Sequence, residues 1–123
     1  MIIDRNLHQY VIHEDTTLAD AMEKISATKG RVLFGVNSQG HLSGVLTNGD
    51  LIRWLVRCRD GIANLRTPVN ELFNTHYCYS TTADSPEKTF ALLDDYLYIP
   101  LIDAQGRLVA VARRRTAKDN NFC

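Results

Sequence analysis

The hydrophobic positions in the first half of the chain follow two different spacings. Within residues 18–25 the apolar side chains recur at i, i+3, i+4 and i+7, which predicts a helix with one apolar face. Thr17, with Asp20 three residues later, forms a capping-box pattern at its start. Residues 31–36 and 41–46 are apolar and β-prone, and the turn sequence Asn-Ser-Gln-Gly lies between them. Apolar positions at helical spacing return in residues 51–56. The pattern therefore predicts a helix, a hairpin and a second helix that ends near residue 57, with a short opening strand at residues 9–12.

The second half of the chain repeats the pattern with weaker signals. Thr67 followed by Pro68 predicts an N-cap and the first position of a short helix. The apolar, tyrosine-rich residues 77–79 predict a brief strand. Ser85 followed by Pro86 predicts another helix start, with Phe90 and Leu93 on its apolar face. Residues 98–102 and 107–113 then read as two strands joined by the turn at residues 103–106.

The two halves match as an internal repeat. Residues 39–45 align with residues 105–111, and Gln, Gly, Leu and Val coincide at one constant offset. We assign residues 1–62 to the first copy and residues 63–123 to the second, in which the final helix is absent or shortened. One copy is too small to bury its own sheet face. We therefore expect an α+β fold of two βαββα repeats packed sheet to sheet with pseudo-two-fold symmetry.

Composition excludes several classes of partner. The 123 residues include 14 basic and 14 acidic side chains, so no net charge favours nucleic acid or an anionic membrane. No apolar run approaches the roughly 18–20 residues that cross a bilayer, and the N-terminus lacks the pattern of a secretory signal. Three cysteines, Cys58, Cys78 and Cys123, without a CxxC spacing fit a reducing compartment. We expect a cytoplasmic protein without a nucleic-acid or membrane partner.

The stretch at residues 42–50 carries the candidate chemistry. It reads as a strand, an Asn-Gly turn and the start of a helix, where free backbone N–H groups favour a phosphate. Thr47 can donate its hydroxyl there, and Asp50 can accept hydrogen bonds from a sugar diol. This arrangement predicts a nucleotide site. The same Thr-x-x-Asp spacing is also a capping box in its own right, and the two interpretations are not exclusive.

The element order, the repeat length and the sequence Gly-Val-Leu-Thr-Asn-Gly-Asp resemble the CBS domain, present as a tandem pair called a Bateman module. The resemblance covers about residues 8–115. It implies an adenosine-type nucleotide whose phosphate is bound by Thr47 and whose ribose is bound by Asp50. It further implies that Arg53 reaches the phosphate. Residues Arg31, Val32 and Leu33 would flank the base.

A narrower resemblance concerns the sequence Thr-Asn-Gly-Asp-Leu-Ile-Arg-Trp-Leu. It is similar to CBS pairs attached to sialic-acid and sugar-nucleotide enzymes, such as N-acetylneuraminate synthase or a sugar nucleotidyltransferase. Those pairs read Thr-Asp-Gly-Asp-Ile-Arg-Arg-Trp-Leu, so this chain lacks one acid, at Asn48, and one arginine, at Ile52. The resemblance implies a regulatory segment of a larger enzyme.

The second copy lacks the same pair of side chains. Arg113 stands at the place of Thr47, and Thr116 at the place of Asp50, so the ribose acceptor is missing. Arg113 and Arg115 share one face of a strand and could bind an anion. The alternative is a solvated strand end.

The leading prediction is a regulatory module without catalytic activity of its own. The chain contains no GxxxxGK[ST], GxSxG or HExxH motif, and its four histidines show no metal-ligand spacing. We expect it to bind AMP, ADP or ATP, to require no cofactor, to form a homodimer through open helix faces, and to control a fused or partner catalytic domain. The alternative is a ligand-free dimerisation scaffold with degenerate nucleotide sites.

Overall fold

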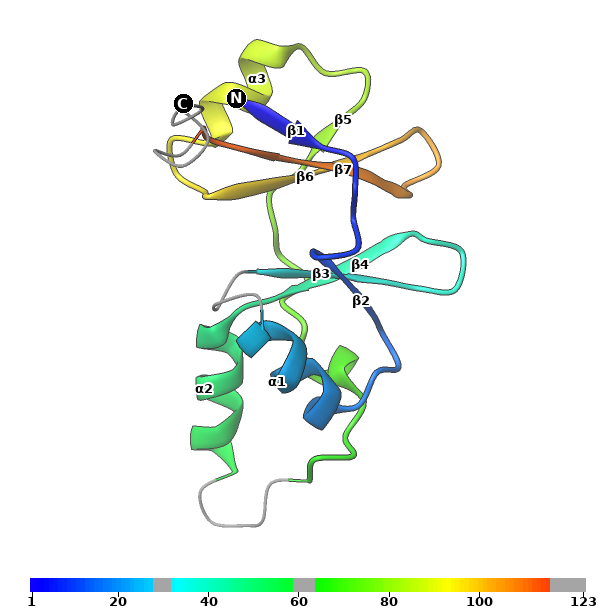
Figure 1. Cartoon of the computed structure of the whole chain (residues 1–123), viewed down its shortest axis with the longest axis vertical. Helices are drawn as coiled ribbons and strands as arrows, with labels where there is room; N and C mark the ends of the chain where they lie inside the picture. The colour runs from blue at the N-terminus through cyan, green and yellow to red at the C-terminus, as the bar shows by residue number, and fades with distance from the viewer. Residues whose placement is uncertain (28–31, 59–63, 116–123) are drawn as a thin grey trace, which may run out of the picture. The chain divides into compact units, whose positions relative to one another are not determined.

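The computed structural model describes residues 1–27, 32–58 and 64–115 (Figure 1). The chain divides into two compact units. The central unit is residues 8–77, and the terminal unit combines residues 1–7 with the chain from residue 78 onward. Each unit contains one sheet and at least one helix, which confirms the α+β class. The sheet-to-sheet packing of the two copies remains a prediction.

The central unit is a three-stranded sheet covered on one face by two helices. Strand β3 lies in the middle, parallel to β2 and antiparallel to β4. Figure 1 shows α1 and α2 on the same face of this sheet. The elements are β2 (Val11–His13), α1 (Leu18–Ala27), β3 (Leu33–Val36), β4 (Leu42–Leu46), α2 (Asn48–Arg57) and the single 3₁₀ turn η1 (Val69–Leu72).

The core of the central unit lies between that sheet face and the helices. The predicted apolar face of α1 supplies Leu18, Ala21 and Ile25, and α2 supplies Leu51, with Trp54 packed at the edge. Strands β3 and β4 contribute the fully buried Leu33 and Leu46. The helical spacing read from the sequence is therefore confirmed, and burial of these side chains fixes α2 against the sheet.

The terminal unit is a four-stranded sheet in the order β1-β7-β6-β5. Its first strand comes from the start of the chain and pairs antiparallel with β7, so that Ile2 lies opposite Arg113. Strand β6 is antiparallel to β7 and parallel to β5. The elements are β1 (Ile2–Asp4), β5 (Ser80–Thr81), α3 (Pro86–Leu92), β6 (Tyr98–Ile102) and β7 (Leu108–Arg113).

The two units contain matching hairpins. The side chain of Asn37 accepts hydrogen bonds from the N–H groups of Gln39 and His41, and Asp103 accepts the equivalent two bonds in β6–β7. Both turns contain a glycine with positive φ, 81° at Gly40 and 82° at Gly106, a conformation that glycine adopts without strain. Both hairpins also have a register shift at the same relative position. These details support the internal repeat.

The prediction for Thr67 and Pro68 is wrong. Pro68 itself occupies the N-cap position of η1, and no side chain caps this turn. The N–H of Val69 donates instead to the carbonyl of Thr16 at 2.8 Å, and the N–H of Asn70 donates to the carbonyl of Glu14 at 3.1 Å. Because these N–H groups hold the loop before α1, they need no cap, and the segment forms one 3₁₀ turn rather than a helix.

Two further predictions in the second half need correction. The short strand lies at β5 (Ser80–Thr81), after the predicted residues 77–79, where the chain runs parallel to β6. Helix α3 begins as predicted at Ser85, whose hydroxyl accepts from the N–H of Lys88 at 3.3 Å. Its buried face carries Thr89 and Leu93, whereas Phe90 is exposed. Thr89 is satisfied there because its hydroxyl donates to that of Ser80 at 2.9 Å.

Some sequence predictions fall outside the described residues. These are Arg31, Thr116 and Cys123, together with the absent or shortened final helix of the second copy. No pattern in the sequence indicates β1, which is only three residues long and pairs with residues 111–113.

Candidate functional site

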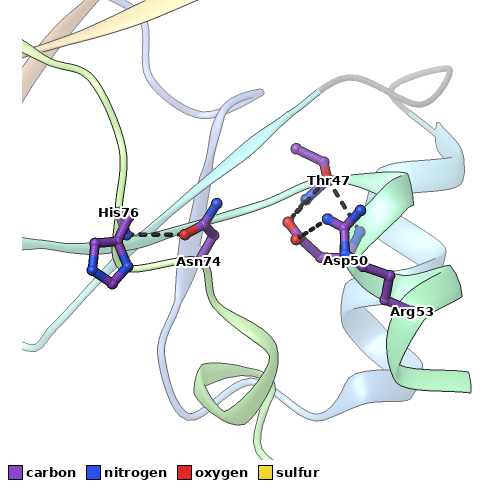
Figure 2. Close-up of polar contacts among 5 residues, drawn as sticks. All are labelled: Thr47, Asp50, Arg53, Asn74 and His76. Carbon is purple, nitrogen blue, oxygen red and sulfur yellow. Dashed lines mark hydrogen bonds and ion pairs between the residues drawn. The ribbon is translucent and has the colours of Figure 1, made fainter. Parts of the chain in front are cut away.

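The start of α2 forms a complete capping box (Figure 2). Thr47 is the N-cap with an extended backbone, φ −123° and ψ 167°. Its hydroxyl oxygen accepts the N–H of Asp50 at 3.3 Å, and its own N–H donates to Asp50 Oδ2 at 2.9 Å. The Thr47 hydroxyl also donates to Asp50 Oδ2, at 2.9 Å. The structural interpretation of Thr-x-x-Asp is thereby confirmed, and it fixes the carboxylate of Asp50 beside the helix N-terminus.

Arg53 binds the other oxygen of the same carboxylate. Its Nη2 donates to Asp50 Oδ1 at 2.6 Å, one helical turn along α2. The two partners differ in exposure, since 68% of the Arg53 side chain but only 10% of the Asp50 side chain is accessible to solvent. The structure therefore brings Thr47, Asp50 and Arg53 together, as predicted from the sequence, and all three contacts converge on one carboxylate (Figure 2).

A hollow of about 730 Å³ opens beside this carboxylate. One wall is the outer face of α2, and the other is η1 and the residues that follow it. Both signs of charge line it, Asp50 and Glu71 against Arg53 and Arg57, so no uniform field fills it. Its lining residues are Asp50, Ile52, Arg53, Val56, Arg57, Glu71, Leu72, Phe73 and Asn74.

The far wall of the hollow is held in place by the sheet. The backbone of Asn74 exchanges two hydrogen bonds with Val45 of β4, at 2.8 and 3.0 Å. The ring of Phe73 lies directly over two glycines, and a Cβ on Gly35 or Gly44 would come within 2.1 or 2.6 Å of Phe73 atoms. Sequence reasoning missed the role of Glu71, Phe73 and Asn74 here, because only the folded chain brings them opposite α2.

Asn74 has a second, local function. Its side-chain oxygen accepts the N–H of His76 at 2.9 Å, which turns the chain after η1 (Figure 2). An Asn whose side chain bonds the backbone two residues later is a common turn device. The Asn-Thr-His sequence could have indicated this turn, but not its position next to Asp50.

The residues predicted to flank a base do not join this cluster. The Leu33 side chain is fully buried in the core between β3 and the helices, so only its backbone could contact a ligand. Val32 is partly buried and does not line the hollow. Arg31 lies outside the described residues. Their contact with a base remains a prediction.

In the second copy the predicted anion-binding arginine already has an acidic partner. Arg113 Nε donates to Asp4 Oδ2 at 2.8 Å, and both side chains are about four-fifths buried. Its neighbour Arg114 binds the carbonyl of Leu93 at 2.7 Å and the carboxylate of Asp94. Arg115 is exposed. The arginines are thus used to join β7 to β1 and to the end of α3.

The described residues also bear on metal binding and on membrane insertion. Within residues 1–27, 32–58 and 64–115, no group of three or more His, Cys, Asp or Glu side chains is placed to hold a metal ion. In the same ranges, every helix is too short or too polar to cross a membrane.

Comparison with protein families bears on the corner, that is, the turn from β4 into α2 at residues 46–50. Residues 3–57 match the family model of the CBS domain. These residues therefore resemble a CBS domain. The matched stretch includes β4, the turn and α2, so Thr47, Asp50 and Arg53 all lie within it. A tandem CBS pair remains a proposal.

The chain is similar in sequence to the magnesium transporter MgtE of Thermus thermophilus. The two are 33% identical over 81 residues, which are 64% of this chain but only 16% of the transporter. The cytosolic domain of the Mg²⁺ channel MgtE, solved in complex with ATP, superposes with a TM-score of 0.66 at 26% identity, covering 85% of this chain and 42% of that one.

Two further solved structures share the fold at lower identity. A CBS domain protein from Streptococcus pneumoniae has a TM-score of 0.80 at 14% identity, covering 91% of this chain and 74% of that one. CBSX2, solved in complex with AMP, has a TM-score of 0.72 at 20% identity, covering 91% and 86%. These likenesses establish the CBS fold for this chain.

Proposed function

We propose that this chain is a regulatory module that binds an adenine nucleotide at the start of α2. The observation that carries the proposal is Asp50, whose carboxylate is fixed at a helix N-terminus by Thr47 and Arg53 and which lines a hollow of about 730 Å³. The ATP complex of the MgtE cytosolic domain and the AMP complex of CBSX2 support this ligand class.

Each residue has a distinct part in the proposed complex. Asp50 accepts hydrogen bonds from the ribose hydroxyls, because a carboxylate is the natural acceptor for a diol. The N–H groups of the first turn of α2 face the phosphate, with Arg53 as its charged partner. The Thr47 hydroxyl keeps its hydrogen bond to Asp50 Oδ2 and holds that carboxylate in place beside the phosphate. No cofactor takes part. The base would lie near Val32, Leu33 and Arg31, as the family resemblance implies.

The proposed regulation is a shift of populations. A nucleotide that binds one arrangement of the module more tightly stabilises that arrangement, and an attached domain senses the change. Coupling of this kind is typically about 1–3 kcal/mol. We propose that the attached domain is catalytic, with an N-acetylneuraminate synthase or a sugar nucleotidyltransferase as candidates. We also propose a cytoplasmic location, supported by the cytosolic MgtE domain.

We further propose that the module forms a homodimer. Ile52, Leu55 and Val56 project from the outer side of α2, with 60%, 41% and 55% of their surfaces exposed. An open apolar helix face of this kind is typical of an interface between copies. The same feature favours the alternative function, a dimerisation scaffold that binds no nucleotide.

Calorimetric titration with AMP, ADP and ATP tests the nucleotide proposal. We expect measurable heat and a raised melting temperature with at least one of them. Asp50→Asn should weaken binding about 10–100-fold, because it removes charge-assisted acceptor bonds to the ribose. Asp20→Asn is the matched control, since Asp20 holds the same position after the N-cap Thr17 of α1, away from the hollow.

The scaffold alternative predicts a different result. At millimolar nucleotide it gives no heat and no melting shift, while the chain still forms dimers. Equal affinities of the Asp50→Asn and Asp20→Asn variants would also reject Asp50 as the ribose acceptor.

A further inference from the structure

The carboxylate of Asp50 is nearly saturated with hydrogen bonds. Oδ2 accepts from the N–H and the hydroxyl of Thr47, both at 2.9 Å, and Oδ1 accepts from Arg53 at 2.6 Å. A carboxylate offers about four lone-pair sites, and these three donors leave about one. A ribose diol presents two hydroxyl donors, so one of the existing donors must leave before both can bind.

Of the donors on this carboxylate, Arg53 is the one that can leave most easily. The two bonds from Thr47 belong to the helix cap, and the Thr47 N–H would lose its partner inside the fold. The Arg53 side chain is 68% exposed, and its i,i+3 pair with Asp50 is of the kind that contributes little in water. Arg53 is also one of the residues that line the hollow that the ligand would enter.

A phosphate gives Arg53 a replacement partner. Guanidinium and phosphate form strong, often bidentate hydrogen bonds. The charges of the hollow are balanced, with Arg53 and Arg57 against Asp50 and Glu71. Attraction of an anion therefore depends on an individual guanidinium rather than on a general positive field.

From this geometry we infer that Arg53 selects phosphorylated nucleosides by guarding the ribose acceptor. In the structure Arg53 donates to Asp50 Oδ1; a bound phosphate draws Arg53 away and releases that oxygen for the ribose. Adenosine alone has no phosphate to draw Arg53 away and must compete with it. This inference rests on the proposed function, and it makes Arg53 a specificity-determining residue that acts in both the empty and the bound state.

The test compares AMP with adenosine on the wild-type chain and on Arg53→Met, which keeps an unbranched flexible stem and removes the charged guanidinium. We expect the variant to bind AMP about tenfold more weakly, because a charge-assisted contact is lost. We expect it to bind adenosine about threefold more tightly, because the competing ion pair is gone. The preference for AMP should therefore fall about thirtyfold, measured by calorimetry for AMP and by NMR shift titration for adenosine.

Lys88→Met is the matched control. Lys88 pairs with Asp84 at 3.1 Å, four residues before it at the start of α3, and is likewise exposed. The substitution removes the same charge from the same kind of surface pair in the other unit, and both affinities should equal those of the wild type. Thermal melting of each variant checks that it is folded.

The possible failures are distinguishable. If the wild type binds AMP and Arg53→Met binds adenosine no more tightly than the wild type does, Arg53 does not guard Asp50, while the proposed nucleotide site stands. If the wild type binds AMP but neither the wild type nor Arg53→Met binds adenosine, Arg53 likewise does not guard Asp50. If the folded wild type binds neither AMP nor adenosine, the proposed function fails and this inference fails with it.

Discussion

The corner at the end of β4 and the corner at the end of β7 occupy equivalent places in the two copies, but their side chains do opposite things. At the first corner Thr47 and Asp50 cap a helix and leave a carboxylate beside an open hollow. At the second corner Arg113 points to Asp4 of β1, and Arg114 binds the end of α3. The first corner therefore presents a hydrogen-bond acceptor, the carboxylate of Asp50. The second presents hydrogen-bond donors, the guanidinium groups of Arg113 and Arg114, which already have partners within the terminal unit.

The same contrast holds for the sheet faces behind these corners. In the central unit Gly35 and Gly44 make room for the ring of Phe73. Their counterparts in the repeat are Leu101 and Ala110, which line a smaller hollow of about 230 Å³. A repeated backbone therefore permits two specialisations: one copy keeps a ligand-sized opening at its corner, and the other uses its corner to bind the start of the chain.

Gly35→Ala should disrupt the packing of Phe73 on the central sheet and should cause the largest loss of stability. The new Cβ would lie 2.1 Å from the Phe73 ring, so the ring or the strand must move. Overpacking of this kind lowers the free energy of unfolding by about 1–3 kcal/mol. Urea denaturation measures the loss. Combining Gly35→Ala with Phe73→Ala should give less than the sum of the two single losses, and strict additivity would contradict the proposed clash.

Asp4→Asn should weaken the second corner by a smaller amount. The Asp4–Arg113 pair is about four-fifths buried on each side, and it joins β1 to β7. We expect a loss of about 1 kcal/mol in the stability of the terminal unit, since a partly buried charge pair lies between the surface and buried cases. Faster amide exchange along β7 would report it.

A paired substitution controls for general charge effects. Asp94→Asn removes an acid from the more exposed pair with Arg114, where 52% of the arginine and 68% of the aspartate side chain are accessible. That substitution should change stability by less than about 0.5 kcal/mol. If Asp4→Asn and Asp94→Asn lower the stability equally, burial of the Asp4–Arg113 pair contributes nothing to the stability of the terminal unit.

The two hairpin turns differ by one titratable side chain, because Asp103 stands in the β6–β7 turn where Asn37 stands in the β3–β4 turn. Exchanging these residues should have the smallest effect on stability, and that effect should depend on pH. The N–H of Arg107, followed by its side chain and the N–H of Gln105, holds the pKa of Asp103 below its usual value. A carboxyl whose pKa is depressed by folding stabilises the native state above its unfolded pKa, about 3.9, and loses that contribution as the pH falls through the folded value. Asn37 cannot titrate.

We therefore expect Asp103→Asn to flatten the loss of stability below about pH 4. Asn37→Asp should steepen that loss, because the new carboxylate would accept the same two backbone N–H groups. Denaturant melts from pH 7 down to acid measure both. Identical acid profiles for wild type and both variants would reject a contribution from these turns.

Local signals in the sequence predicted the elements that depend on neighbours in the chain. Thr17 and Ser85 mark helix starts, the spacing of residues 18–25 marks the buried face of α1, and Gly40 and Gly106 mark the hairpin turns. Strand β1 escaped prediction because three residues carry no periodicity and their partners lie at the opposite end of the chain. The helix predicted from Thr67 and Pro68 did not form, because the N–H groups after Pro68 bond to the loop before α1, which is distant in the sequence.

The candidate site was predicted in part for the same reason. Thr47, Asp50 and Arg53 are spaced by single helical turns, so their association follows from α2 alone. The opposite wall of the hollow, with Glu71 and Asn74, depends on the pairing of Asn74 with Val45 and on Phe73 fitting over glycine. Neither relation leaves a pattern in the sequence.

The pairing of β1 with β7 constrains the order in which the molecule can assemble during translation. Residues 8–77 form one uninterrupted segment and can fold as soon as they leave the ribosome. Ile2, Ile3 and Asp4 must wait unpaired until β7 has been synthesised, so their contacts with Arg113, Ala112 and Val111 close the longest loop in the chain. The proposed ligand corner can therefore form before the terminal sheet does.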